Sequence, residues 1–360
     1  TFCTISCFGL LFAMKYWNFT LELLPSALGS HIPRWDFLVP LGLSFFIFQS
    51  MSYVIDVYRN KQKCEKNVLK YALFVSFFPQ MVQGPISRYG QLAPQLTAEH
   101  SLCWTDIQAG IQLALWGYFK KLVIADRAAI LVNNVISENC PYGGAVIATG
   151  IFFYCIQLYC DFSGGIDITR GVARLFGIDM VQNFRRPLFA TSLTDYWRRW
   201  HITLSSWFKE YVYIPLGGNR KGLARQILNI LIVWTLTGIW HGAGWNFLFW
   251  GLWFALFLIL EKLFLGELLK NAPVVFGRVY TLTVVLISWV FFALEKPGEI
   301  PAYLQAMFGL NGVGLMNTQA MFLGNEYLVL LIIALVACLP VGSLLVHRLK
   351  SSKTGPAMAL

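Results

Sequence analysis

Residues 226–260 read QILNILIVWTLTGIWHGAGWNFLFWGLWFALFLIL, and this stretch decides the class of fold. It contains two apolar runs, Gln226–Trp240 and Gly244–Leu260, separated by a short break that begins with His241. Each run approaches the roughly 20 apolar residues that a helix needs to cross a bilayer. The stretch therefore predicts two membrane helices with a histidine at the turn between them.

The composition of the whole chain points the same way. Of its 360 residues, 57% are hydrophobic and only 13% are charged, and the mean hydropathy is +0.58. A soluble domain usually has about a quarter of its residues charged, because they cover its surface. The composition therefore argues against a soluble enzyme, a disordered chain and a fibrous protein. It favours a multi-span membrane protein, and the aromatic share of 16% suits interfacial belts.

The net charge of +10 and the eight cysteines have simple interpretations in a membrane protein. Basic residues interleaved with apolar spans are typical of cytoplasmic loops rather than of a nucleic-acid surface, so we expect no nucleic-acid partner. The cysteines form no CxxC pair, disulfide framework or zinc pattern. The sequence also lacks HExxH, GxSxG, P-loop and GxGxxG motifs, and we expect no metal ion.

The rest of the chain contains further apolar stretches, and their lengths indicate which of them could span a membrane. Two shorter ones, Tyr71–Val82 and Ile166–Ile178, are predicted to be re-entrant or in-plane pieces. The chain begins at once with an apolar stretch that no basic segment precedes, so we suspect that its natural start is missing. The longer stretches are predicted spans: Thr1–Trp17, Phe37–Ile55, Tyr142–Cys160, Val279–Leu294 and Tyr327–Leu345.

A polar segment over residues 185–225 mixes basic and aromatic side chains. It has eight basic residues against the two acids Asp195 and Glu210, together with aromatic residues that include Trp197, Trp200, Trp207, Tyr211 and Tyr213. An in-plane amphipathic helix at the membrane interface would produce this pattern. A pocket for a phosphate-bearing ligand with a flat ring would produce it too. Pattern alone favours the amphipathic helix.

Within this segment, Ser192 and Asp195 match a capping box, so a helix should start near Leu193. On one helix, an aromatic face would include His201, and Asp195 and Arg199 could pair. A histidine on such a face is more often a hydrogen-bonded core residue than a catalytic one. The residues expected on that face are Trp197, Trp200, His201, Leu204 and Phe208, whereas Arg198, Arg199 and Lys209 lie away from it.

His241 is the stronger candidate for a functional residue. It follows an apolar run and precedes Gly242, which places it at a helix end within an apolar region. Ionisable groups at membrane depth are costly and are functional candidates by default. Imidazole is also suited to take a proton from a hydroxyl near neutral pH. A structural histidine with satisfied hydrogen bonds is the alternative.

Several motifs taken together resemble the membrane-bound O-acyltransferase (MBOAT) family, in particular its bacterial branch that O-acetylates alginate and other polysaccharides. The resemblance covers the chain from about residue 35 to its end. The motifs are PLGLSFF (40–46), FFPQMVQGPI (77–86), DFSG (161–164), NFRRP (183–187), YWRRWH (196–201), LSSW (204–207), YIPLGGNR (213–220) and GIWHGA (238–243).

The resemblance implies a fold and a set of site residues. The fold would be a single all-α domain over residues 1–360, with roughly eight or more spanning, re-entrant and in-plane helices around a central tunnel. It would lack its N-terminal helices. His241 would be the general base, and His201 would orient the acceptor or stabilise the tetrahedral intermediate. The substrate-binding residues would be Asn183, Arg198, Arg199, Trp207 and Trp240, of which Arg198, Arg199 and Trp207 would hold the donor's phosphates and adenine.

The resemblance also implies substrates and partners. The donor would be cytosolic acetyl-CoA, with no bound cofactor, and the protein would lie in the bacterial inner membrane among lipids. An extracytoplasmic partner with an SGNH-hydrolase-like fold would relay the acetyl group to a polysaccharide. Two alternatives stay open, namely D-alanyl transfer to teichoic acid and a transporter in which His241 belongs to a proton or substrate path.

Overall fold

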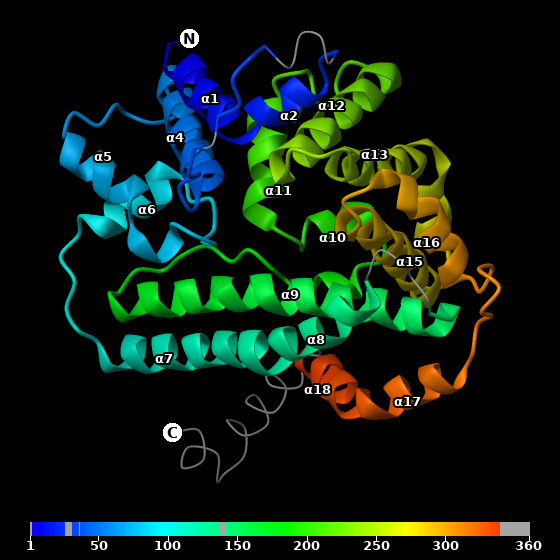
Figure 1. Cartoon of the computed structure of the whole chain (residues 1–360). Coiled ribbons are helices and arrows are strands. Elements are labelled where there is room, and N and C mark those ends of the chain that lie inside the picture. The colour runs from blue at the N-terminus through cyan, green and yellow to red at the C-terminus, as the bar shows by residue number, and fades with distance from the viewer. Residues whose placement is uncertain (1, 26–30, 36, 137–141, 339–360) are drawn as a thin grey trace. The chain divides into compact units, whose positions relative to one another are not determined.

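The computed structural model describes residues 2–25, 31–35, 37–136 and 142–338, which form helices joined by turns, without a strand in those ranges (Figure 1). The predicted all-α class is confirmed. The chain divides into two compact units. The first contains residues 1–118 and 162–297, and the second contains residues 119–161 and 298–360. One domain over residues 1–360 stays a prediction.

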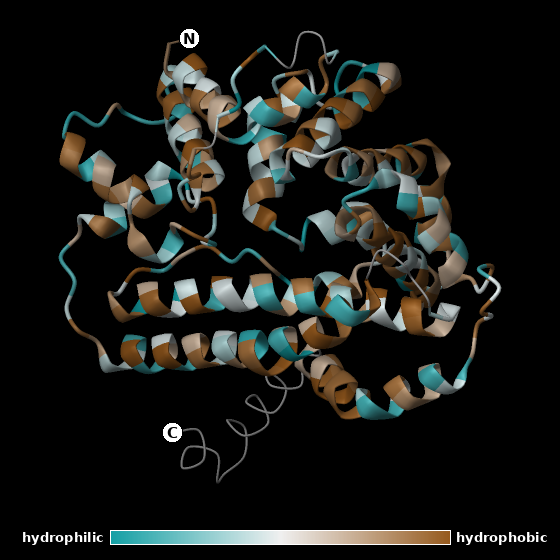
Figure 2. Cartoon of the chain, in the orientation of Figure 1, coloured by the Kyte–Doolittle hydropathy of each residue, from teal (hydrophilic) through white to brown (hydrophobic). Residues whose placement is uncertain are grey.

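Four helices in the described part of the chain are long and apolar enough to cross a membrane. Figure 2 shows the hydrophobic colouring along α12, α13 and α15. A fifth span results if α17 and α18, which meet at a bend of 54°, count as one. The protein is therefore multi-pass, but eight or more spans are not confirmed. The four helices are α9 (Gly144–Leu175), α12 (Leu223–His241), Trp245–Asn271 and α15 (Val274–Ala293). Trp245–Asn271 comprises α13 (Trp245–Leu260), the π-helical η5 (Glu261–Leu265) and α14 (Gly266–Asn271).

The first part of the chain forms shorter helices. The predicted spans Thr1–Trp17 and Phe37–Ile55 correspond to apolar helices of 14 and 16 residues. The second of these helices starts after Gly42, whose positive φ of +76° and contact with the Met81 carbonyl leave no room for a side chain. The helices are α1 (Phe2–Lys15), α2 (Trp17–Glu22), α4 (Leu43–Tyr58), α5 (Val68–Val75), η1 (Phe78–Gln80), α6 (Tyr89–Leu96) and α7 (Trp104–Tyr118).

Helix α9 corrects one prediction. The stretch Ile166–Ile178, expected to be a separate re-entrant or in-plane piece, is largely the continuation of α9, which runs unbroken to Leu175. Gly164 lies inside this helix, and its carbonyl would collide with any Cβ at Gly117 of α7. Small residues let two apolar helices approach closely, so glycine here serves helix packing rather than a turn.

The segment around His201 corrects a second prediction. The predicted helix start is confirmed, because the Ser192 side chain accepts a hydrogen bond from the Asp195 backbone N–H at the start of α10 (Leu193–Trp197). The single helix is wrong, since the chain turns at His201 and restarts as α11 (Ile202–Phe208). The π-helical η4 (Lys209–Tyr213) follows, and the 3-10 helix η3 (Pro187–Phe189) precedes α10.

Helices α12 and α13 form a tight hairpin around the break that the sequence predicted. Gly242 and Gly244 are extended between the two helices. A Cβ at Gly238 would overlap the Phe247 carbonyl oxygen, and one at Gly251 would overlap the Trp234 carbonyl oxygen. The two backbones are therefore in direct contact, and α13 packs in turn against α15. This hairpin fixes the position of His241.

The second unit contains the remaining helices. An apolar cluster that includes Leu131, Phe153 and Tyr327 joins several of them. The predicted span Tyr327–Leu345 begins as α18, and its residues from 339 onward lie outside the described part. The elements of this unit are the π-helical η2 (Phe119–Ala125), α8 (Asp126–Val135), the first half of α9, α16 (Ile300–Met307), α17 (Thr318–Glu326) and α18 (Leu328–Cys338). The 3-10 helix η6 (Pro297–Glu299) lies at the boundary between the units.

Candidate active site

His241 is the last residue of α12, and one of its ring nitrogens is already engaged. The Nδ1 atom lies 2.7 Å from the carbonyl oxygen of Thr237, one turn earlier. A carbonyl oxygen only accepts hydrogen bonds, so Nδ1 carries the proton and donates it. In the neutral ring, Nε2 is then left with a lone pair. The local helix thus prepares Nε2 as an acceptor of protons.

Aromatic rings surround this imidazole. Its centroid lies 4.6 Å from that of Trp250, 5.0 Å from Trp240 and 5.8 Å from Phe292, with the ring planes steeply inclined to one another. These rings come from α12, α13 and α15, so three helices of the first unit hold the imidazole. The side chain is partly buried rather than fully enclosed. Such an apolar surround limits competing water while leaving an approach to the ring.

His201 is held in the opposite tautomer. The Asn183 Oδ1 atom accepts hydrogen bonds from the backbone N–H and the hydroxyl of Thr203, each at 2.9 Å. With Oδ1 fixed in this way, the Asn183 amide group donates to His201 Nδ1 at 3.2 Å. In the neutral ring the proton then resides on Nε2. His201 therefore presents an N–H donor where His241 presents an acceptor.

The surroundings of His201 are closed and strained. The residue is 2% exposed, and burial together with the nearby His241 holds the pKa of His201 well below its usual range. Its backbone adopts φ of +44°, which is rare for a residue with a side chain and occurs preferentially at functional sites. Its Nε2 atom is buried and has no hydrogen-bond partner among the described residues. An unsatisfied buried N–H is costly, so the Nε2–H group is a candidate hydrogen-bond donor to a substrate.

Trp240 brings the two histidines together. Its ring centroid lies 5.0 Å from that of His241 and 6.0 Å from that of His201. The indole is 8% exposed, and its Nε1 is a second buried donor for which the described residues supply no partner. Two histidines predicted from separate motifs, 40 residues apart, thus share one neighbour. The structure thus brings the predicted pair to one aromatic neighbour, and the catalytic roles of the two histidines stay predictions.

The other predicted binding residues have varied surroundings. Asn183 is fully buried and contacts His201. Trp207 is buried, stacks on Phe48 and donates its N–H to the Phe48 carbonyl. Arg199 pairs with Asp195 at 2.9 Å, which confirms the predicted pair, and Arg198 is exposed. Their roles toward a substrate stay predictions.

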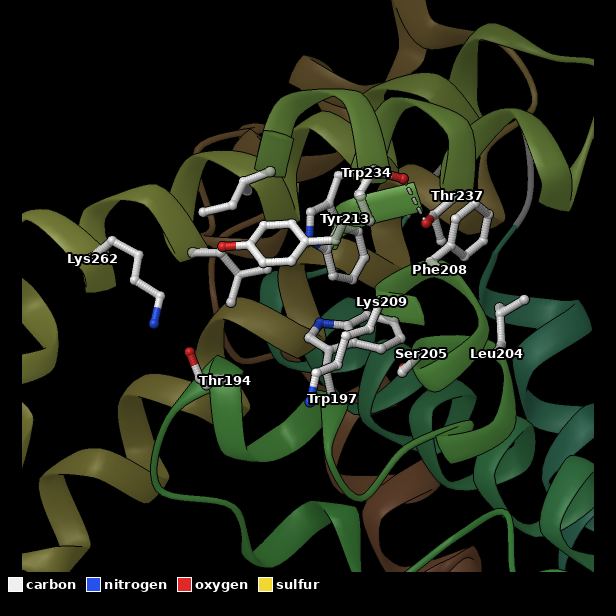
Figure 3. A pocket seen from close by; sticks show the side chains of 13 residues that line it. Thr194, Trp197, Leu204, Ser205, Phe208, Lys209, Tyr213, Trp234, Thr237 and Lys262 are labelled. Carbon is white, nitrogen blue, oxygen red and sulfur yellow. Dashed lines mark hydrogen bonds between the residues drawn. The ribbon is translucent and has the colours of Figure 1, made fainter. Parts of the chain in front are cut away.

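A cavity of about 250 Å³ adjoins the helix turn that holds His241. Thr237, whose carbonyl binds the His241 ring, lines it, and Lys209 and Lys262 add two cations to its wall. Figure 3 shows the polar ends of Lys262, Thr194 and Tyr213 on one side of the cavity and Thr237 on the other. The remaining lining is largely apolar and aromatic. Lys262 thus lies on the side of the cavity opposite Thr237.

Glu261 and Lys262 are site residues that the sequence analysis missed. The Glu261 carboxylate accepts hydrogen bonds from the backbone N–H groups of Leu193 and Thr194 and from the Thr194 hydroxyl. It therefore anchors α10, the helix that precedes His201. A charge within the apolar run that continues α13 was the available signal, because charges at membrane depth have reasons to be there. Within the described ranges, no group of three or more histidine, cysteine or acidic side chains could hold a metal ion.

The helices and the histidine pair define a multi-pass membrane protein with a candidate acid–base centre. Comparison with known proteins identifies its family. The profile of MBOAT, the membrane-bound O-acyltransferase family, matches residues 30–296. The chain is 36% identical over 305 residues to a probable alginate O-acetylase AlgI of Pseudomonas putida, covering 81% of this chain and 62% of that protein. It is 34% identical over 338 residues to a peptidoglycan O-acetyltransferase of Helicobacter pylori, covering 86% and 64%.

A more distant relative is the teichoic acid D-alanyltransferase of Bacillus subtilis. It is 25% identical over 270 residues, covering 71% of this chain and 65% of that protein. The chain thus spans a little over three fifths of the length of these three relatives. The extent of the profile match and the identities show that the chain belongs to the membrane-bound O-acyltransferase family.

Proposed function

We propose that this chain is the catalytic part of a membrane O-acyltransferase that moves an acetyl group from acetyl-CoA toward hydroxyls of an extracytoplasmic polysaccharide. Membership of the family and similarity to proteins named as O-acetylases support this class of reaction. The observation that carries the proposal is the opposite preparation of the two histidines, since one offers a lone pair and the other an N–H.

The chemistry assigns each ring one task. His241 Nε2 takes the proton from the acceptor hydroxyl while the hydroxyl oxygen attacks the thioester carbonyl carbon. His201 Nε2–H donates to the oxyanion of the tetrahedral intermediate. The carbon–sulfur bond then breaks, and the proton on His241 passes to the departing thiolate. The new ester and free CoA are the products, and His241 returns to its neutral form.

The cavity beside Thr237 suits a donor with an apolar arm and an anionic end. We assign the two lysines in its wall, Lys209 and Lys262, to the phosphates of CoA. Charge-assisted hydrogen bonds to phosphate are stronger than hydrogen bonds between neutral groups. The thioester arm would then extend along the aromatic wall toward Thr237, whose carbonyl binds the His241 ring. Arg198 and Arg199, predicted from the sequence, would add cations near the same segment, with Trp207 near the adenine.

The proposal also covers the membrane, the tunnel and the partner protein. We place the full-length protein in the bacterial inner membrane, with eight or more helices around a central tunnel through which donor and acceptor meet. The acceptor hydroxyl would belong to an extracytoplasmic partner with an SGNH-hydrolase-like fold, which passes the acetyl group to the polysaccharide. No bound cofactor or metal ion is needed, because the two histidines supply the proton transfer and the oxyanion contact.

The proposal is tested with the purified protein in nanodiscs and acetyl-CoA labelled in the acetyl group, with and without the partner protein. We expect label on the partner or on added polysaccharide, and its loss in His241→Ala. A matched control is His100→Ala, which replaces an exposed histidine outside the site. Label that transfers equally well in His241→Ala would contradict the proposal.

The alternatives give distinct results in the same assay. A D-alanyltransferase would ignore acetyl-CoA and transfer D-alanine, as the name of the Bacillus subtilis relative indicates. A transporter would move labelled substrate across a vesicle membrane without forming an ester. The identities of 34–36% to O-acetylases against 25% to the D-alanyltransferase favour acetyl transfer.

A further inference from the structure

The C-terminal end of α12 lacks the usual backbone cap. Gly242 follows the helix with φ of −170°, so it is extended and does not form the left-handed cap that often closes a helix. The last carbonyl groups of a helix have no partner within that helix. In an apolar membrane region, such carbonyls need donors from elsewhere. The turn that carries His241 therefore needs hydrogen-bond donors from another part of the chain.

Two neighbouring side chains at the end of α1 supply these donors. Lys15 Nζ donates to the Trp240 carbonyl at 2.6 Å and lies 3.4 Å from the His241 carbonyl. The Tyr16 hydroxyl donates to the Ile239 carbonyl at 2.6 Å. Both contacts join residues more than 220 positions apart in sequence. Three successive carbonyls at the end of α12 are therefore satisfied from one point on the N-terminal segment.

The charge of Lys15 suits this place. The C-terminus of a helix carries a partial negative charge, and a cation there is stabilising. The ammonium also lies 5.9 Å from the centre of the Trp240 ring, within the range of a cation–π contact. No carboxylate pairs with Lys15 among the described residues, whereas Lys121 pairs with two and Lys270 with one. The ammonium therefore contacts the end of α12 and the neighbouring aromatic rings of Tyr16 and Trp240.

We propose that Lys15 is a positioning residue for His241: its ammonium, assisted by the Tyr16 hydroxyl, caps α12 and so fixes the direction of the catalytic imidazole. This rests on the proposed role of His241 as the base. The Thr237 bond that selects the His241 tautomer exists only while the last turn of α12 is intact. Without the cap, the turn frays and the lone pair of Nε2 loses its fixed direction.

The test compares Lys15→Met, which removes the donor, with Lys15→Arg, which keeps a cationic donor. The first readout is hydrogen exchange of the backbone amides over residues 236–248 in the intact protein. We expect faster exchange in Lys15→Met confined to that peptide, and parent-like exchange in Lys15→Arg. Tyr16→Phe, which removes only the hydroxyl, should give a smaller increase. This readout needs no activity.

The second readout is turnover of labelled acetyl-CoA. Misplacing a reacting group by about 1 Å can cost roughly 100-fold, so we expect kcat of Lys15→Met to fall by about 10- to 100-fold with KM nearly unchanged. Lys15→Arg should restore kcat to within about threefold of the parent, which is under 1 kcal/mol at 1.4 kcal/mol per tenfold. Partial unfolding would also lower the apparent kcat at constant KM, so the rates are normalised to the folded fraction, and exchange that changes only over residues 236–248 separates positioning from a general loss of structure.

The outcomes separate this proposal from the proposed function. A parent protein without turnover contradicts the proposed function, while the exchange data still decide whether Lys15 holds the helix end. Unchanged exchange and kcat in Lys15→Met overturn the positioning role. Equal losses in Lys15→Met and Lys15→Arg overturn it as well, because the retained donor would have made no difference. If Lys15→Met does not fold, Tyr16→Phe and Lys15→Arg decide by the same two readouts.

Discussion

The end of α12 and the junction of α10 and α11 hold the same side chain in different ways. At the end of α12, His241 bonds to a carbonyl of its own helix and stays partly accessible. At the junction, His201 is buried, has a strained backbone and is held by Asn183 from another segment. A group that takes up and returns a proton needs access to the reactants, whereas a fixed donor needs rigid surroundings. The surroundings, rather than the residue type, distinguish the two roles.

The largest effect should come from removing the accessible histidine. We expect His241→Ala to lower kcat by about 1,000-fold or more, within the range that general base catalysis contributes. Folding should change little, because the ring makes one hydrogen bond, to its own helix. Transfer of labelled acetyl and the melting temperature measure the two quantities. A larger loss of kcat in His201→Ala than in His241→Ala would reverse the division of roles.

The next effect should come from releasing the buried histidine. Asn183→Leu keeps the side-chain volume but removes the amide that fixes His201, so we expect kcat to fall by about 10- to 100-fold. The matched control is Asn229→Leu, which removes another fully buried asparagine that bonds to the Gly218 carbonyl instead. Steady-state kinetics should separate the pair. Similar kcat losses in both variants would mean that lost stability, not lost orientation, is the cause.

A smaller effect should come from the wall of the cavity, and it should change KM rather than kcat. Lys262→Met removes one cation from its wall, so we expect KM for acetyl-CoA to rise by about three- to tenfold with kcat unchanged. Lys270→Met is the control, since Lys270 is an exposed residue in the following helix that pairs with Glu267. Titration with acetyl-CoA measures KM in both variants. An unchanged KM in Lys262→Met would remove this cavity from the donor site.

The smallest effect should be on the pH dependence of stability, through the proton that folding excludes from His201. Because its pKa is lowered on folding, the unfolded chain binds a proton near pH 6.5 that the folded protein excludes. Stability therefore falls as pH drops below about 6.5. His201→Gln lacks this group, so its melting temperature should fall less steeply than that of the parent between about pH 7.5 and 5. Differential scanning fluorimetry in detergent measures both slopes. Equal slopes would show that folding does not lower the pKa of His201.

Local patterns predicted the parts of the molecule that depend on local physics. Hydropathy and the Gly-Ala-Gly break located α12 and α13, and the Ser192 cap located the start of α10. The same reasoning missed the break at His201. Spacing along a helix reports which residues are buried, and the predicted face residues are buried here although the helix stops between them. Burial is recorded in the pattern, but the backbone angle of +44° is not.

Contacts between residues far apart in the chain could not be predicted from the sequence. The stretch Ile166–Ile178 was predicted to be a separate piece, and no local pattern indicated that α9 continues through it beside Gly117 of α7. Asn183 and Lys15 act through partners 18 and 225 positions away. Neither contact leaves a periodic or local signal. The motifs therefore located the two histidines and Asn183, whereas the contact of Asn183 with His201 and the place of Lys15 at the end of α12 emerged from the tertiary structure.

The glycine contacts between α12 and α13 have a consequence for motion. Backbones that touch at Gly238 and Gly251 leave no side-chain layer that could rearrange, so the hairpin moves as one rigid body. Helix α1, by contrast, is joined to the end of α12 by side-chain hydrogen bonds from Lys15 and Tyr16. Any opening of the first unit to admit a substrate must therefore displace helices around the hairpin. The hairpin itself remains the stationary frame.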